Sequence, residues 1–194
     1  MSVPESPSSD SSKETHGCDE GQTGFRGASL EDLEEYLLKP EASSCSSERW
    51  EQLRDIAVGG VQRHDLSDEA RLRWGRLALS AISRKYGEGS PQRATAEAVN
   101  VRTYMIKEFG VSNADPARNL SALCSDIRRD LEVPLNVATR LAEEWRSAPR
   151  EQMLQLRRIK NMLTPLFPVQ ALLEGDDPVL RDIRAWLALV PRLP

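Results

Sequence analysis

Apolar residues recur every three or four positions along most of the chain from residue 49 to residue 194. Six stretches carry this spacing, at 50–61, 72–82, 120–131, 135–145, 153–163 and 179–190. Such spacing places the apolar side chains on one side of an α-helix. No stretch of useful length alternates apolar and polar residues as a half-buried strand does. The pattern therefore predicts an all-α fold, with a compact multi-helix domain over residues 49–194.

The first 48 residues follow a different pattern. Residues 1–28 are rich in Ser, Glu, Asp, Gly and Pro, so they cannot bury enough apolar surface to offset the entropy of ordering, and we expect a disordered acidic tail. Residues 29–48 predict a short acidic amphipathic helix with a Leu stripe, followed by a Ser-rich linker. A helix this short is marginal alone. The segment 29–39 is therefore expected either to dock on its own domain or to bind a protein partner.

Residues 91–110 predict two short helices joined by a tight turn. The Ser-Pro pair at 90–91 is typical of a helix start. Asn100 tolerates the left-handed conformation and is the predicted corner. Ile106 and Phe109 lie one turn apart and are predicted to face inward from the second helix. The start and outer side of that helix would then hold Arg102, Thr103, Tyr104 and Lys107.

The stretch 92–110 resembles the helix-turn-helix of DNA-binding proteins of the repressor or partition-protein type. Ala96 matches the small residue where the two helices cross, and Val99 and Val101 match the apolar pair beside the turn. Ile106 and Phe109 match buried positions of the recognition helix. The chain departs from the family's usual pattern at the corner, which is more often Gly, although Gly and Asn both accept a positive φ.

The resemblance implies double-stranded DNA as the partner. Side chains at the start of the second helix would contact base edges or phosphates, with Arg102 placed for guanine. These are Arg102, Thr103, Tyr104 and Lys107. Gln92, at the opening of the first helix, would bond to the DNA backbone. An ordinary corner between two packed helices has the same spacing and is the alternative.

Charge divides the chain into two parts. Residues 1–48 hold three basic and eleven acidic residues, a balance of −8. Residues 49–194 hold 23 basic and 19 acidic residues, a balance of +4. The mildly basic helical part is compatible with DNA binding, although a charge this small does not argue for it strongly.

Residue types that carry catalysis or bind metals are sparse. Cys18, Cys45 and Cys124 do not have the spacing of a zinc site. His64 beside Asp65 is typical of a surface pair, and neither Gly pair precedes the Lys of a phosphate-binding loop. We therefore expect no enzyme activity, no metal site and no cofactor. No apolar run is long enough to cross a membrane and no secretory signal is present, which predicts a cytoplasmic protein.

The sequence thus predicts a sequence-specific DNA-binding regulator of transcription or of plasmid or phage maintenance. The alternative is a helical protein-interaction module, such as an antitoxin, anti-activator or adaptor, acting through 29–39 or through the C-terminal helix. That helix, 178–190, is apolar enough either to close the core or to pair with its copy in a homodimer.

Overall fold

The computed structural model describes residues 25, 27–39, 42 and 45–194. This part of the chain is all-α, with short 3-10 segments between the helices and no strand. The α-helices are α1 Leu30–Leu38, α2 Ser47–Val61, α3 Asp68–Tyr86, α4 Pro91–Phe109, α5 Leu120–Asp130, α6 Leu135–Glu143, α7 Arg150–Leu163 and α8 Pro178–Leu189. The predicted disordered tail, 1–28, lies almost entirely outside the described residues.

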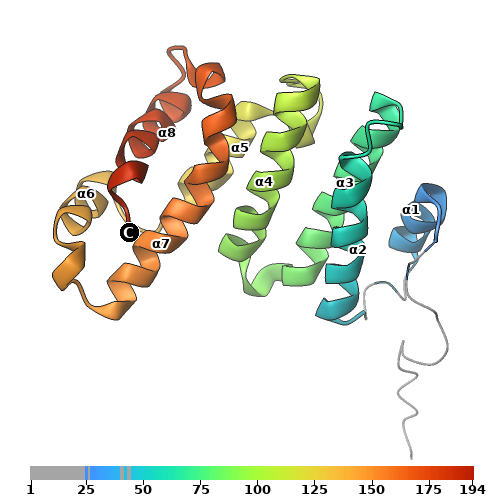
Figure 1. Cartoon of the computed structure of the whole chain (residues 1–194), viewed down its shortest axis with the longest axis horizontal. Helices are drawn as coiled ribbons and strands as arrows, with labels where there is room; N and C mark the ends of the chain where they lie inside the picture. The colour runs from blue at the N-terminus through green and yellow to red at the C-terminus, as the bar shows by residue number, and fades with distance from the viewer. Residues whose placement is uncertain (1–24, 26, 40–41, 43–44) are drawn as a thin grey trace, which may run out of the picture.

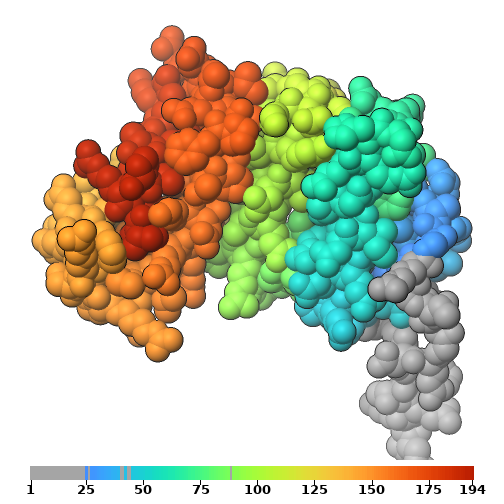
Figure 2. Space-filling view, viewed as in Figure 1, coloured from blue at the N-terminus to red at the C-terminus, as the bar shows by residue number. Residues whose placement is uncertain are grey.

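Helices that are adjacent in the sequence pack against each other through most of the fold. α2 packs on α3, α3 on α4 and α4 on α5, while α8 packs on α5. A ten-residue 3-10 segment, η5 (Thr164–Leu173), follows α7 and packs against both α4 and α8. Figure 1 shows the helices as a row that runs from α1 at one end to α6 at the other. Three of them, α2, α4 and α7, form side-by-side ridges on the face shown in Figure 2.

The helix α4 lies between two hydrophobic cores. Val99 and Ile106 belong to the core shared with α5, α7 and α8. Val101 and Met105 belong to the core shared with α1, α2 and α3. Positions 99 and 106 lie on one side of a helix, and 101 and 105 lie on another. α4 is therefore a common wall that joins the two halves of the molecule.

The predicted apolar stripe of α2 is confirmed as core, and that of α3 is confirmed in part, because Gly75 and Ile82 are buried but Leu72 and Leu79 are half-buried. In α2, Trp50, Leu53, Ala57 and Val61 are all buried. The predicted start of α3 is also confirmed, because the Ser67 hydroxyl accepts a hydrogen bond from the backbone N–H of Ala70.

The predicted acidic helix forms α1 and docks on its own chain. Leu30 and Leu33 are buried. The guanidinium of Arg73 on α3 forms ion pairs with Glu31 at 3.0 Å and Glu34 at 2.5 Å. Of the two alternatives for this segment, the described contacts are those of docking within the chain.

The predicted turn at Asn100 is wrong. α4 runs without a break from Pro91 to Phe109, and no described residue other than glycine has a positive φ. Asn100 is exposed, and its side-chain amide donates to the carbonyl of Ala96 at 3.2 Å. The helix-turn-helix predicted at 91–110 is therefore not formed there. The apolar residues on either side of Asn100 belong to one helix with two buried faces, rather than to two helices that meet at a corner.

The apolar face of the C-terminal helix is used within the chain. Ile183, Trp186 and Leu187 of α8 are buried in the core that includes Val99 and Ile106. These are the residues that a homodimer through 178–190 would need. Of the two alternatives, the structure has the one in which this helix closes the core. None of the helices in the described part of the chain has both the length and the apolar composition needed to cross a membrane.

Candidate functional site

Arg102, the residue predicted to contact guanine, is buried and bonded within the chain. The residue is 8% exposed. One terminal nitrogen, Nη1, pairs with Asp126 at 2.9 Å, and Nη2 donates to the carbonyls of Pro116 and Asn119 at 2.9 and 3.0 Å. Arg102 therefore ties α4 to the segment that leads into α5, and it cannot reach a base in this conformation.

The other four predicted DNA contacts do not form one surface. Thr103 is buried, and its hydroxyl has no hydrogen-bond partner in the described structure. Tyr104 is half-buried, with its hydroxyl 3.1 Å from Nη2 of Arg71. Gln92 and Lys107 are exposed, but they lie near opposite ends of α4, about 22 Å apart along the axis.

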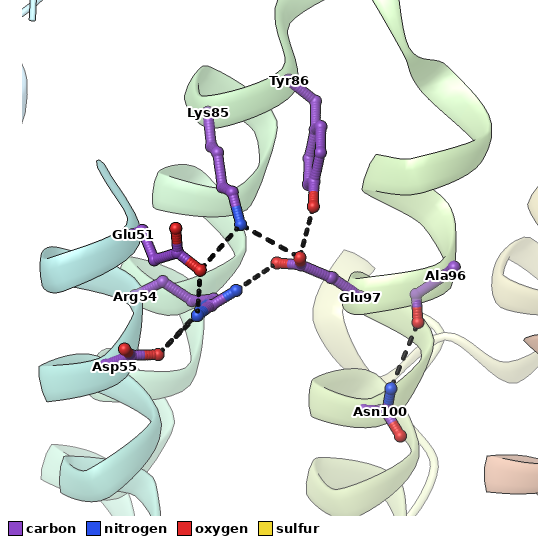
Figure 3. Close-up of polar contacts among 8 residues, drawn as sticks. All are labelled: Glu51, Arg54, Asp55, Lys85, Tyr86, Ala96, Glu97 and Asn100. Carbon is purple, nitrogen blue, oxygen red and sulfur yellow. Dashed lines mark hydrogen bonds and ion pairs between the residues drawn. The ribbon is translucent and has the colours of Figure 1, made fainter. Parts of the chain in front are cut away.

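A network of charged side chains joins α2, α3 and α4 on the face shown in Figure 3. At its centre the Glu97 carboxylate accepts from Arg54 at 2.7 Å, from Lys85 at 3.1 Å and from the Tyr86 hydroxyl. We call this group of six the Glu97 cluster: Glu51, Arg54, Asp55, Lys85, Tyr86 and Glu97.

The Glu97 cluster holds its central carboxylate in the ionised state. Burial alone would raise the pKa of Glu97, but hydrogen bonds from Tyr86, Arg54 and Lys85 outweigh burial and lower that pKa below its usual value. Burial, together with donation to Glu97, raises the pKa of Tyr86. Glu51 and Asp55 also accept from Arg54, at 3.1 and 2.7 Å, so the three carboxylates and two cations of the cluster all have a partner and leave a net charge of −1. The charges in the cluster are thus paired with one another.

The Glu97 cluster borders a groove between α2 and α4. The groove has a volume of about 340 Å³, and we call it the α2–α4 groove. Val58, Val61, Ile82 and Val101 give it an apolar lining. Its polar lining residues are Arg54, Asp55, Gln62, Glu97, Asn100 and Tyr104. An apolar groove with a polar rim is the usual form of a site that accepts an apolar side chain.

A second groove lies on the other side of α4, between α4 and α7. This α4–α7 groove has a volume of about 280 Å³. Its lining residues are Ser90, Gln92, Arg93, Ala96, Asp130, Glu132, Gln155, Arg158, Ile159, Asn161 and Met162. Figure 2 shows both hollows, one on each side of the ridge formed by α4.

The polar side chains of the two grooves differ in their contacts. In the α4–α7 groove, those of Ser90, Gln92, Arg93, Arg158 and Asn161 make no hydrogen bond or ion pair with any described residue. The charged residues of the α2–α4 groove, by contrast, are paired within the Glu97 cluster.

One buried oxygen in the wall of the α4–α7 groove also lacks a donor. Asp130 is 8% exposed, and its Oδ1 accepts from Nε of Arg129 at 3.0 Å. Its Oδ2 is buried, and no described group donates to it. A buried acceptor without a partner costs about 1–3 kcal/mol of stability. This groove therefore contains polar groups whose bonding capacity is not used by any residue that the structure describes.

Neither groove could have been found from local sequence patterns. The lining residues come from three helices and lie up to 72 positions apart in the chain, from Ser90 to Met162. Arg93, Arg157 and Arg158 are all Arg residues on amphipathic helices, yet only the first and last line the groove. One local feature of the sequence could have indicated the α4–α7 groove. The helix that begins at the Ser-Pro pair has no acidic residue in its first turn, so the positive end of its dipole is not compensated.

The described residues give no support to metal or thiol chemistry at either groove. No group of three or more His, Cys, Asp and Glu among them is placed to hold a metal ion. Cys124 is buried in the core, where desolvation raises the pKa of its thiol to about 12.

Comparison with known proteins adds no functional assignment to this geometry. No family model, no curated protein and no solved structure matches the chain.

Proposed function

We propose that the protein is a helical protein-interaction module in which the α2–α4 groove accepts an apolar side chain from a partner. The observation that carries the proposal is the groove itself, with its apolar lining of Val58, Val61, Ile82 and Val101. Hot spots at protein interfaces are enriched in Trp, Tyr and Arg anchors seated in well-packed pockets, and the first two of these present a large apolar ring.

The Glu97 cluster supports this role. Because its charges are paired with one another, the partner does not need to supply a charge to the rim of the groove. The cluster also connects α2 to α4 through Arg54 and Glu97, which fixes the spacing of the two ridges that flank the groove. A preformed groove lowers the cost of ordering on binding.

The two elements first expected to dock a partner are engaged elsewhere. α1 packs on α3, and α8 packs into the core. The proposed docking surface therefore moves from the ends of the chain to the face that carries α2 and α4.

Site-specific photo-crosslinking identifies the partner. A benzophenone amino acid at Gln62, an exposed residue that lines the groove, is expected to give an adduct with one protein. The control places the same group at Glu143, an exposed residue on α6 that lines neither groove.

Binding of the purified partner then tests the groove. Val58→Arg fills the groove and is expected to weaken binding by more than about tenfold. Val111→Arg is the matched control, since Val111 is 45% exposed and lies outside both grooves. Equal weakening by the two variants, or identical adducts from Gln62 and Glu143, would contradict the proposal.

Duplex DNA is a second candidate, favoured by a set of arginines that no described acidic residue pairs with. They are Arg93, Arg150, Arg157 and Arg158, all exposed on α4 and α7. Contacts with phosphates predict binding that weakens steeply with salt. Fluorescence anisotropy with a labelled duplex at low and near-physiological salt tests this candidate, and an absence of binding at low salt removes it.

A further inference from the structure

We propose that the α4–α7 groove is a binding site for a zwitterion of the amino-acid class, either a free amino acid or a short unblocked peptide, with an apolar side chain. The proposal concerns the opposite side of α4 from the α2–α4 groove and does not depend on the protein-interaction role.

The groove offers donors for a carboxylate. Arg93 of α4 and Arg158 of α7 both line it, and neither guanidinium has a partner among the described residues. Arg is well suited to bind a carboxylate because two N–H groups can donate in parallel.

The start of α4 adds to this positive end of the groove. The Ser90 side chain makes no capping hydrogen bond, and the first turn of α4 has no acidic residue. The positive end of the helix dipole is therefore not compensated by the helix's own residues. Ser90 and Gln92, from this end of α4, both line the groove.

The groove also offers acceptors for an ammonium group. Asp130, the last residue of α5, and Glu132 both line it. Oδ2 of Asp130 is the buried oxygen that lacks a donor. Asp130 as a residue lines the groove, so its carboxylate is the acidic group placed beside a bound ammonium. Within the described part of the chain, Glu132 has only a long contact with the side-chain amide of Gln155, at 3.5 Å.

The two sets of charges line one groove without pairing with each other. No ion pair joins Arg93 or Arg158 to Asp130 or Glu132. In the Glu97 cluster, by contrast, side chains from three helices do meet and pair. A ligand that carries both an ammonium and a carboxylate satisfies both sets at once, whereas an anion or a cation alone would meet repulsion from one of them.

The remaining lining residues favour a ligand with an apolar side chain. Ala96, Ile159 and Met162 supply apolar wall, and the volume of about 280 Å³ lies near the lower end of the range for small-molecule sites. The volume is sufficient for a single leucine, methionine or phenylalanine, whereas a dipeptide or tripeptide that contains one of them would extend out of the groove.

Isothermal titration of the full chain tests the site. The probes are leucine, methionine, phenylalanine, Leu-Leu and Leu-Leu-Leu, together with N-acetyl-leucine and leucinamide, which lack the ammonium and the carboxylate respectively. We expect binding of at least one unblocked probe, and weaker binding of both blocked analogues by about tenfold or more. The length of the probe that binds most tightly shows whether the natural ligand is a free amino acid or a peptide.

A matched pair of variants locates the binding. Arg158→Gln is expected to weaken the tightest probe by about tenfold or more, whereas Arg157→Gln, at the neighbouring exposed position outside the groove, leaves it unchanged. Both residues are exposed, so neither change is expected to impair folding, which circular dichroism checks. The proposal is overturned if no unblocked probe binds at ~10 mM. It is also overturned if a blocked analogue binds as tightly as its parent, or if Arg157→Gln weakens binding as much as Arg158→Gln.

Discussion

Replacing Arg102 with Met tests whether this residue holds the fold together or contacts a ligand. Met keeps a long apolar side chain in the buried position but removes the guanidinium. The variant loses the two hydrogen bonds to the carbonyls of Pro116 and Asn119 and the ion pair with Asp126. We therefore expect Arg102→Met to lower the free energy of unfolding.

The size of the loss follows from these contacts. At the lower end of the range for charge-assisted bonds, the two carbonyl contacts contribute about 3 kcal/mol. Asp126 is 38% exposed and also pairs with Arg129, so its loss adds only about 0.5 kcal/mol. The Nε of Arg102 is buried without an acceptor, and its removal returns about 1 kcal/mol. The net loss is about 2–3 kcal/mol, which in a chain of this size lowers Tm by roughly 5–10 °C.

Thermal and urea unfolding of the purified variant measure this loss. The matched control is Lys107→Met on the same helix, because Lys107 is exposed and has no described partner. The control is expected to change stability by no more than about 0.5 kcal/mol. The structural role of Arg102 is refuted if Arg102→Met is as stable as Lys107→Met in both unfolding experiments but loses affinity for duplex DNA. That result would restore the predicted guanine contact.

Three further changes test the cluster and the helices around α4. The lowered pKa of Glu97 stabilises the fold above the usual carboxyl pKa, and this stability is lost as the pH falls through the folded-state value. Glu97→Gln is therefore expected to flatten the loss of stability on acidification below about pH 5. Urea unfolding over a series of pH values measures this loss, and equal slopes for the two proteins would show that the cluster contributes nothing. Asn100→Ala is expected to exceed Asn100→Gly in stability by about 1 kcal/mol in a continuous helix, whereas a left-handed corner at this position would reverse the order. Gly60→Ala is expected to lower the free energy of unfolding by about 1–3 kcal/mol, because its Cβ would overlap the Trp74 ring. Gly59→Ala is the control and is expected to be neutral or stabilising, because a Cβ at Gly59 meets open space. Equal stabilities of the two variants would show that Trp74 can move aside.

Single-helix patterns were sufficient to predict most of the fold. The stripe of Trp50, Leu53, Ala57 and Val61 needed only the helical period, because α2 buries one side against α3. The start of α3 needed only Ser67, because a side-chain cap is a local interaction.

The helical period of apolar residues could not by itself predict that α4 is one continuous helix, because this helix is buried on two sides. Val99 and Ile106 on one side and Val101 and Met105 on the other fill much of its circumference with apolar residues. Asn100 is exposed between them and has the residue type of a helix corner, so a break was predicted where the helix continues. A helix with two buried faces can be told from two helices only when both cores are known.

The role of Arg102 also depended on contacts that local patterns do not contain. Its partners lie 14 to 24 positions further along the chain, and two of them are backbone carbonyls. Every residue type supplies a carbonyl, so no choice of residue at 116 or 119 could have indicated the bond. The same limit applies to the two grooves, whose shapes depend on how three helices pack.

The position of α4 has a consequence for the two proposed sites. One helix forms a wall of the α2–α4 groove and a wall of the α4–α7 groove. An occupant of one groove that displaced α4, against the hydrogen bond between Arg54 and Glu97, would narrow the other groove by the same movement. Binding at the two grooves would then be thermodynamically coupled, and each ligand would change the affinity of the other by the same factor. A small molecule could in this way set the strength of a protein contact about one helix diameter away, on the order of 10 Å.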